Sequence, residues 1–467
     1  MTADKIKFGT DGWRAIIAQD FTVYNVARVS QALADWLLSN QKEAKVVVGH
    51  DCRFAGELFA ETATKVLCAN GIKVYLAQGF ISTPMISLGV LKLGAQQGVV
   101  ITASHNPPSY NGYKLKGAHG GPSSPKDIAA VEALIKDEVK IPAESLAHWE
   151  DEGLLEYVNL EDMYIEYLKS KFNFDELNNS PFKLAYDAMY GAGQNVIRRL
   201  MPGAVLLHCE NNPGFNGQAP EPLDRNLQEL SKTIRNTPEL KIGLATDGDA
   251  DRIGLYDEDG NFVDAHHIIL LLVHYLHKYK GMNGKVAIAF SATDRVKRMA
   301  EQYGLPVEVT PIGFKYISEI MIKEDVLVGG EESGGIAVKG HIPERDGIYD
   351  GLVLYEFMTQ SGKTLKQLCE EVYEVVGRFV YDRNDLHIEN DKKEAIIKKA
   401  LDRGYTKFGK YAFNNIETLD GVKYHLENGG WVMLRASGTE PLLRVYAEGN
   451  SKEETADILN DVLETIL

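Results

Sequence analysis

Short apolar strands alternate with amphipathic helices over most of the chain, and the pattern starts three times. A helical stripe over Val23–Leu37 precedes the strand Val46–Gly49, and new starts follow at the strands Lys183–Asp187 and Lys285–Ala289. Alternation of this kind is typical of layered α/β units with largely parallel strands. The sequence therefore predicts three similar α/β units with mixed, largely parallel sheets. No sequence repeat links them, so any kinship among them is architectural.

A different pattern follows the helical stripe Leu365–Val376, which stops at Gly377. Beyond it we expect a helix near Glu394–Leu401, short strands, and a closing helix that opens with the capping box Ser451–Glu454. These last residues are predicted to form a separate α+β domain. Earlier in the chain, the polar and weakly periodic segment Pro142–Gly153 is predicted to be a linker.

Composition narrows the class of protein. The 467 residues are 44% hydrophobic and 25% charged, which suits three or four globular domains. A formal charge of -16 argues against a nucleic-acid binder. No apolar run reaches membrane-spanning length, and the N-terminus lacks the apolar core of a signal peptide. The four cysteines are scattered and are expected to be reduced, as in a cytoplasmic enzyme: Cys52, Cys68, Cys209 and Cys369.

A serine follows one of the buried strands. The apolar run Gly98–Ile101 leads into TASHNPPSYNGYK, residues 102–114, in which Asn-Pro and Asn-Gly mark turns. A serine at such a strand tip, Ser104, is well placed to act as a nucleophile. The hydrolase motif G-x-S-x-G is absent, so a hydrolase elbow is excluded. An ordinary serine loop is the alternative on this segment alone.

Three aspartates lie at alternate positions of the loop DGDADR, between two strand-like runs. Asp247, Asp249 and Asp251 can converge on one hard cation, and three protein ligands leave room for substrate oxygens, which favours Mg²⁺. An EF-hand is rejected because Arg252 occupies the position where that loop needs glycine and because the flanks are strands. A merely solvated acidic loop is the remaining alternative, disfavoured by the mutual repulsion of the carboxylates.

Two further loops offer recognition groups. GGEESGG, residues 329–335, places two carboxylates and a hydroxyl where sugar hydroxyls can be bound, although such turns are also common on surfaces. RASGTEP, residues 435–441, with Arg444 nearby, can cradle a phosphate dianion; an exposed charged turn is the alternative. Together the four loops indicate phosphoryl transfer, with a second phosphate held by a separate clamp.

Five segments in order give the chain a resemblance to the α-D-phosphohexomutase superfamily: FGTDGWRAI (residues 8–16), TASHNPPSYNGYK, DGDADR, GGEESGG and RASGTEP. The resemblance spans nearly the whole chain. It implies three similar α/β domains and a fourth domain like the TATA-binding protein, arranged around one central cleft. We expect the domains to cover residues 1–152, 153–257, 258–373 and 374–467.

The resemblance also implies roles for individual residues. Ser104 would be a phosphoserine that holds Mg²⁺ together with Asp247, Asp249 and Asp251. Arg14 and Arg252 would stabilise the transferring phosphoryl group, and Lys114 and His105 are the candidates for general acid and base. Lys114 would suit the role if neighbouring cations lowered its pKa. The substrate-binding residues implied are Gly313, Lys315, Glu331 and Ser333 for the sugar, and Arg435, Ser437, Gly438, Thr439 and Arg444 for the phosphate that does not react.

The resemblance implies interconversion of hexose 1-phosphate and hexose 6-phosphate through a hexose 1,6-bisphosphate, which also serves as activator. Glucose is expected to be preferred, because this chain has Gly335 where bacterial dual-specificity phosphomannomutase/phosphoglucomutases typically carry a histidine. Arg345, in HIPERDG, is expected to supply a substrate-binding cation instead. Mannose is expected to be accepted, because Glu331 and Ser333 would bind O3 and O4 and neither is expected to contact C2. The alternatives are a phosphoglucosamine mutase and an inactive phosphosugar-binding regulator. A monomer or small homo-oligomer without nucleic-acid or membrane partners is expected.

Overall fold

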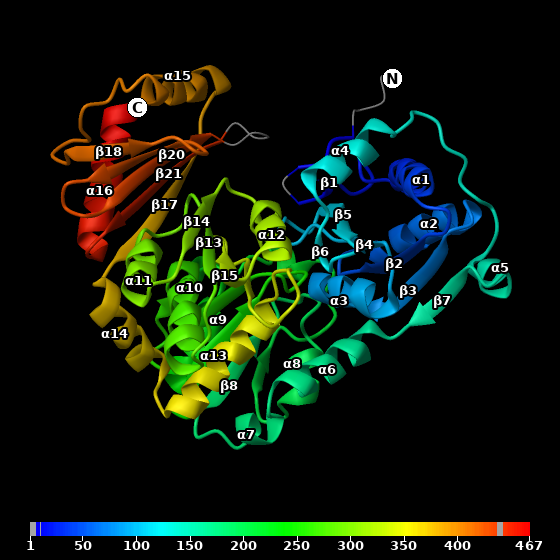
Figure 1. The fold of residues 1–467 in the computed structure, drawn as a ribbon, viewed down its shortest axis with the longest axis horizontal. Coiled ribbons are helices and arrows are strands. Elements are labelled where there is room, and N and C mark those ends of the chain that lie inside the picture. Colours follow the sequence, from blue (N-terminus) through cyan, green and yellow to red (C-terminus); the bar gives the residue numbers. More distant parts are fainter. Residues whose placement is uncertain (1–5, 10, 437–441) are drawn as a thin grey trace. The chain divides into compact units, whose positions relative to one another are not determined.

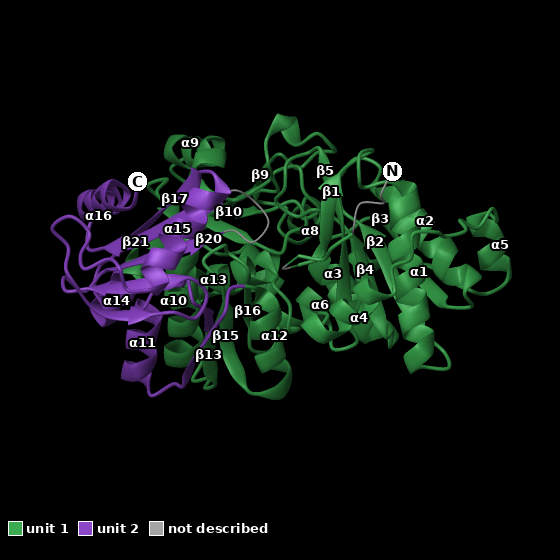
Figure 2. Ribbon diagram, turned by 90° about the horizontal axis from the view of Figure 1, so that it is seen from above, with its two compact units in different colours: residues 1–287, 313–369 green, residues 288–312, 370–467 purple. Residues whose placement is uncertain are grey.

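The structure, a computed structural model, describes residues 6–9, 11–436 and 442–467. The chain forms two compact units, which Figure 2 distinguishes by colour. Unit 1 consists of residues 1–287 and 313–369, and unit 2 consists of residues 288–312 and 370–467.

The first sheet of unit 1 has the strand order β1-β5-β4-β2-β3-β7, and β6 pairs with β5 (Figure 1). Its strands are β1 (Trp13–Ile16), β2 (Lys45–His50), β3 (Lys73–Phe80), β4 (Gln97–Ile101), β5 (Tyr110–Gly117), β6 (Gly121–Pro122) and β7 (Leu155–Val158). The pairs among β4, β2, β3 and β7 are parallel, and those of β5 are antiparallel. The predicted mixed sheet is therefore confirmed here, and β4 ends at the serine loop.

Helices cover both faces of this sheet. Its helices are α1 (Val23–Asn40), α2 (Gly56–Ala69), α3 (Thr83–Leu93), α4 (Pro125–Ala133) and α5 (Leu146–Asp151). Val99 and Ile101 of β4 belong to the core that α1 and α2 cover. Gly98 faces the other way, where a Cβ would lie 2.7 Å from Ile86 of α3. This alternation follows from the pleat of a strand.

The second sheet has the order β12-β11-β10-β8-β9, again with parallel and antiparallel pairs. Its strands are β8 (Lys183–Asp187), β9 (Val205–Leu207), β10 (Leu240–Thr246), β11 (Ile253–Tyr256) and β12 (Phe262–Val263). The helical segments around it are α6 (Leu160–Lys171), α7 (Phe174–Asn178), α8 (Val196–Leu200), the short η1 (Phe215–Gly217) and η2 (Asp224–Asn226), and α9 (Gln228–Asn236). The predicted metal loop is the turn between the antiparallel neighbours β10 and β11.

The third stretch alternates strands and helices as predicted. Its elements are α10 (Ala265–His274), η3 (Tyr275–Tyr279), β13 (Lys285–Ala289), α11 (Arg295–Tyr303), β14 (Val307–Thr310), α12 (Phe314–Lys323), β15 (Val326–Gly330), β16 (Ile336–Val338), α13 (Gly347–Ser361) and α14 (Leu365–Val376). Strands β15 and β16 pair antiparallel, and the loop between them is GGEESGG.

The C-terminal sheet is antiparallel throughout, with the order β17-β21-β20-β19-β18. Its elements are β17 (Val380–His387), α15 (Asn390–Leu401), β18 (Phe413–Glu417), β19 (Val422–Leu426), β20 (Trp431–Ala436), β21 (Leu442–Gly449) and α16 (Lys452–Ile466). Val432 and Leu434 pack on the helix side, whereas Trp431 and Met433 pack on Phe290. Ser451 caps α16 as predicted, because its Oγ accepts the N–H of Glu454 at 3.2 Å. The Glu454 side chain accepts the N–H of Asn450 instead of the Ser451 N–H that a full capping box requires.

The predicted linker Pro142–Gly153 contains the helix α5, which Ser145 caps by accepting the N–H of His148. One and a half turns carry too little periodicity to be recognised in a sequence. Strand β7 extends the first sheet beyond the boundary that we placed after residue 152, because it pairs with β3 over Val74–Ala77. None of the described helices is long and apolar enough to cross a membrane.

Candidate active site

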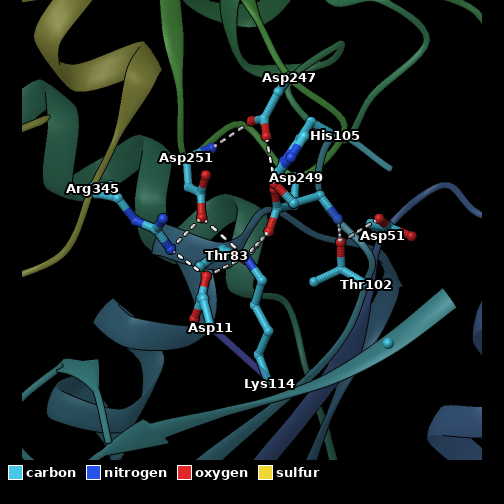
Figure 3. A network of polar contacts seen from close by, with 12 residues as sticks. Asp11, Asp51, Thr83, Thr102, His105, Lys114, Asp247, Asp249, Asp251 and Arg345 are labelled. Carbon is cyan, nitrogen blue, oxygen red and sulfur yellow. Dashed lines mark hydrogen bonds and ion pairs between the residues drawn. The ribbon is translucent and has the colours of Figure 1, made fainter. Parts of the chain in front are cut away.

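The serine loop holds Ser104 in a strained conformation. Its φ is +52°, a region that residues with a Cβ seldom adopt. The Ser104 N–H donates to Thr102 Oγ1 at 2.9 Å, and its Oγ donates to Asp247 Oδ2 at 2.7 Å and lies 3.3 Å from His105 Nδ1. The serine is buried. Figure 3 shows three of the side chains named here, Thr102, His105 and Asp247. The loop therefore presents one hydroxyl directly to the acidic loop of the second sheet.

A buried arginine, Arg53, stabilises the backbone of this loop. Arg53 donates to four backbone carbonyls of the serine loop, those of Ser104, Asn106, Pro107 and Tyr110, at 2.6–3.0 Å. Satisfying four buried acceptors with one cation stabilises a backbone that no regular ladder supports.

Asp51 completes the support of the serine loop. Its carboxylate lies 3.3 Å from Arg53 Nε and accepts from the Thr102 hydroxyl, which in turn accepts the Ser104 N–H. Burial raises the pKa of Asp51 to about 6, although Arg53 opposes the shift. Neither Asp51 nor Arg53 stands in a motif that the sequence alone makes recognisable. The only local signal is their position directly after β2, whose C-terminal end lies beside that of the parallel strand β4.

The three predicted metal ligands do converge. Asp247, Asp249 and Asp251 are fully buried, and one oxygen of each lies within 4.8 Å of those of the other two. Glycine is required between them, because a Cβ on Gly248 would lie 2.4 Å from the carbonyl oxygen of Ser104. The acidic loop is thus pressed against the serine backbone.

The electrostatics of this cluster fit a divalent cation. Burial and repulsion from Asp249 and Asp251 raise the pKa of Asp247 well above its usual range. The Oδ1 atoms of Asp249 and Asp251 are buried and accept no hydrogen bond from the described residues. A hard cation would bind the buried oxygens that lack donors, and its charge would offset the repulsion among the carboxylates.

Lys114 reaches the same cluster from β5. Its Nζ lies 2.8 Å from Asp249, 3.0 Å from Asp251 and 2.8 Å from Asp11. Burial opposes the charged lysine, but the three carboxylates outweigh it and raise its pKa. The lowered pKa that would suit a general base is therefore absent in this arrangement. Asp11, within FGTDGWRAI, was not singled out in the sequence.

Arg345 also contacts the metal loop. It pairs with Asp251 at 2.7 Å and with Asp11, and its guanidinium lies over the ring of Phe314. A Cβ on Gly335 would lie 2.5 Å from Arg345 Cδ, so a larger residue at position 335 would require the arginine side chain to move. Its role as a substrate cation stays a prediction.

The other predicted groups of the phosphoryl site surround the serine loop. Arg14 lies on β1, and its Nη1 donates to Asn106 Oδ1 at 2.8 Å. Arg252 follows the metal loop, with Glu221 3.8 Å away. Burial, followed by Arg252 and Arg14, lowers the pKa of His105 well below its usual range. The surroundings of the imidazole beside the serine therefore disfavour its charged form.

The predicted sugar loop is held in part by the neighbouring helix start. Glu331 is buried and its Oε1 accepts the N–H of Gly313, where α12 begins, at 2.8 Å. Gly334 N–H donates to the Glu331 carbonyl, and the Gly334 carbonyl accepts from Ile253 of β11. Ser333 and Lys315 are partly exposed on the same two segments. The structure brings Gly313 and Glu331 together as predicted.

The predicted phosphate clamp lies in unit 2. Arg435 of β20 and Arg444 of β21 are directly opposite one another in the antiparallel register. Like charges in such a pair repel, and an anion between them would relieve the repulsion. Ser437, Gly438 and Thr439 lie outside the described residues.

Comparison with known proteins decides the family. Four phosphoglucomutase/phosphomannomutase models match consecutive parts of the chain: alpha/beta/alpha domains I (residues 5–141), II (162–260) and III (264–376), and the C-terminal domain (387–465). A Methanosphaera stadtmanae protein named "Probable phosphoglucosamine mutase" is 30% identical over 97% of this chain and 96% of its own length.

This chain belongs to the phosphoglucomutase/phosphomannomutase family. The phosphoglucomutase/phosphomannomutase of Thermococcus kodakarensis is 29% identical over 97% of this chain and 96% of its own length. A crystal structure of a Thermus thermophilus protein named "putative phosphomannomutase" superposes with a TM-score of 0.87 at 34% identity, covering 99% of both chains.

Family membership confirms the predicted fold class, with three α/β domains and a C-terminal domain, and the predicted enzyme class. The chain is an isomerase of the phosphohexomutase type. The four domain boundaries and the roles of the individual site residues stay predictions.

The buried carboxyl of this phosphohexomutase loop gives a prediction for stability. Burial raises the pKa of Glu331 to about 7, although Arg345 opposes the shift. Because the folded-state pKa lies above the unfolded value, ionisation penalises the folded state. The penalty is absent below about pH 4.5 and complete above about pH 7, where it reaches roughly 3 kcal/mol. Glu331→Gln cannot ionise but can still accept the Gly313 N–H.

We therefore expect the free energy of unfolding of Glu331→Gln, relative to wild type, to rise by up to about 3 kcal/mol between pH 4.5 and 8. Urea unfolding at several pH values measures this difference. Glu301→Gln, at an exposed position of α11, is the matched control. Parallel pH curves for wild type and Glu331→Gln would contradict the prediction.

Proposed function

We propose that the chain interconverts hexose 1-phosphates and hexose 6-phosphates through a phosphoserine at Ser104, with glucose preferred and mannose accepted. The observation that carries the proposal is the hydrogen bond from Ser104 Oγ to Asp247 inside a buried group of three carboxylates. A nucleophilic hydroxyl next to a cation site is the arrangement that phosphoryl transfer needs. A cytoplasmic location and a monomer or small homo-oligomer stay predictions.

In the proposed reaction the bond between phosphorus and Ser104 Oγ breaks, and phosphorus bonds to the free hydroxyl oxygen of the sugar phosphate, whose proton leaves to a base. Ser104 Oγ, released in this first transfer, takes up a proton. The hexose 1,6-bisphosphate then turns end for end. In the second transfer Ser104 Oγ loses that proton and bonds to the other phosphorus, the bond between that phosphorus and its sugar oxygen breaks, and the released sugar oxygen takes up a proton to become a hydroxyl. The phosphate count on the enzyme is unchanged after one cycle.

The residues of the chain divide this work. Asp247, Asp249 and Asp251 would hold Mg²⁺, which supplies charge stabilisation for the transferring oxygens. Arg14, bound to the serine loop, and Arg252 would contact the transferring phosphoryl group. Lys114 and His105 stay the two proposed candidates for general acid and base, although the three carboxylates around Lys114 raise its pKa in this arrangement. The clamp of Arg435 and Arg444 would bind the phosphate that is not reacting.

Sugar selectivity gives the test of the proposal. Glu331 and Ser333 would bind O3 and O4, which glucose and mannose share, and neither is expected to contact C2. A site that leaves C2 without a polar partner discriminates against the epimer only weakly, within roughly 10–100-fold. For galactose 1-phosphate, whose O4 is inverted, kcat/KM should be lower than for glucose 1-phosphate by orders of magnitude.

We therefore expect kcat/KM to fall in the order glucose, mannose and galactose 1-phosphate, measured with Mg²⁺ and catalytic glucose 1,6-bisphosphate. Equal use of glucose and galactose phosphates would show that the Glu331 loop does not bind the sugar as proposed. Turnover of none of the three sugars, with phosphosugar binding retained, would favour a regulatory protein.

A phosphoglucosamine mutase is the second candidate, favoured by the name of the 30% identical relative. The substrate of this second candidate differs from that of the first at C2 of the sugar, where an ammonium replaces a hydroxyl. Adding glucosamine 1-phosphate to the same panel separates the two, because the second candidate requires the highest kcat/KM for that substrate.

A further inference from the structure

The two arginines of the clamp are not supported equally. Arg435 forms a two-point ion pair with Asp420, with Nε 3.0 Å from Oδ1 and Nη2 3.3 Å from Oδ2. Among the described residues, the carboxylate nearest to Arg444 is that of Asp385, 3.8 Å from its Nε. A two-point pair fixes the plane of a guanidinium, whereas a single long approach does not. Asp420 therefore sets the orientation of one arginine of the pair.

Asp420 is itself fixed in place. It precedes Gly421, whose φ is +98° and whose Cβ, if present, would lie 2.6 Å from the Leu434 carbonyl and 3.2 Å from Arg435 Cβ. The turn is thus packed against the strand that carries the arginine. The side chain of Asp420 is 26% exposed and that of Arg435 is 18% exposed, so an anion in solution can reach the pair.

The same carboxylate also holds a loop of unit 2. Asp420 Oδ2 accepts the backbone N–H of Ile312 at 2.9 Å. The next residue, Gly313, donates its N–H to Glu331 of the predicted sugar loop. Within unit 2, the carboxylate beside the predicted phosphate clamp therefore also holds the backbone at Ile312.

We propose that Asp420 is a positioning residue for substrate binding: it orients Arg435 toward the phosphate monoester that does not react. The proposal rests on the proposed function, since it needs the clamp to bind a phosphate. A guanidinium is planar and has five N–H donors, so a pair through two of its nitrogens fixes the directions of all its donors.

The sign of the effect distinguishes positioning from plain charge repulsion. A carboxylate near a phosphate dianion weakens binding by repulsion, so its removal would tighten binding if charge alone mattered. Positioning predicts the reverse, because Arg435 loses the partner that fixes its plane. A contact made equally in ground state and transition state changes KM and leaves kcat nearly constant.

The test compares Asp420→Asn, Asp420→Ala, Arg435→Ala and the double variant Asp420→Ala/Arg435→Ala, with Asp457→Asn as matched control. Asp457 lies on α16 of the same unit, where it pairs with the exposed Lys410 and accepts from the Tyr411 hydroxyl. We expect KM for glucose 1-phosphate to rise about ten-fold in both Asp420 variants, with kcat within about two-fold of wild type. Intact mass should still show Ser104 phosphorylation.

The four variants separate the possible failures. If Arg435→Ala leaves KM unchanged, the clamp in the proposed function is wrong. If Arg435→Ala raises KM but the Asp420 variants do not, or if they lower it, the positioning role is wrong. A KM rise from Asp420→Ala that persists in full on the Arg435→Ala background would also overturn it, because the carboxylate would then act elsewhere. Asp420→Asn keeps the shape of the side chain, so it guards against loss of folding in Asp420→Ala.

Discussion

Ser104→Ala is expected to reduce turnover of hexose phosphates to near background, a loss of several orders of magnitude. No other hydroxyl among the described residues donates to the Asp247–Asp249–Asp251 group from the serine loop, and Ser104 Oγ does so at 2.7 Å. Alanine retains a Cβ, so the backbone strain at φ +52° is unchanged and only the nucleophile is lost. Coupled assay of glucose 6-phosphate formation measures the loss.

Ser109→Ala is the matched control, since Ser109 lies in the same loop with an exposed side chain. Intact mass should show one phosphate on wild type and on Ser109→Ala, and none on Ser104→Ala. Substantial activity in Ser104→Ala would rule out the covalent route, whatever the mass spectrum shows.

Arg53→Met is expected to lower the free energy of unfolding by about 3–5 kcal/mol. The substitution leaves four backbone carbonyls and the buried Asp51 carboxylate without their cation. Activity should fall with it, because the serine loop loses its support. Urea unfolding of the transition that includes unit 1 gives the change.

Two comparisons show whether the buried cation is responsible. Arg225 is exposed, and its Nη2 lies 3.7 Å from Glu221 Oε2. Arg225→Met should therefore lower the free energy of unfolding by less than about 0.5 kcal/mol. Asp51→Asn in combination with Arg53→Met should recover part of the loss, because it removes the unpaired carboxylate. A loss no larger than that of Arg225→Met would mean that the carbonyl contacts contribute little.

The residues that could be predicted from the sequence are those that carry their chemistry in a local pattern. Ser104 follows a buried strand, and Asp247, Asp249 and Asp251 alternate in a tight turn, so strand ends and spacing were enough to identify them. Residues that act through contacts distant in sequence gave no such signal. Arg53 stands in an ordinary helix entry, and only the parallel pairing of β2 with β4 brings it under the serine loop.

The direction of the pKa shift of Lys114 could not be predicted from the sequence either. Whether Lys114 loses or gains affinity for its proton depends on which charges surround it, and the structure supplies three carboxylates where cations were needed. The fold could be predicted from the sequence more directly than the pKa shifts, because the spacing of apolar residues indicates strands and helices locally. Its exceptions are the short helix α5 and the edge strand β7, which are too short to carry a period.

The ion pairs of the active site also bear on how the chain folds. Arg345 meets Asp11 across 334 residues of sequence, and Lys114 meets Asp249 across 135. Contacts of such long range form late, because their loops must close first. During synthesis, Asp11 and Asp251 are made well before the arginine that neutralises them. About three quarters of the chain must therefore leave the ribosome before this acidic cluster has its full complement of cations.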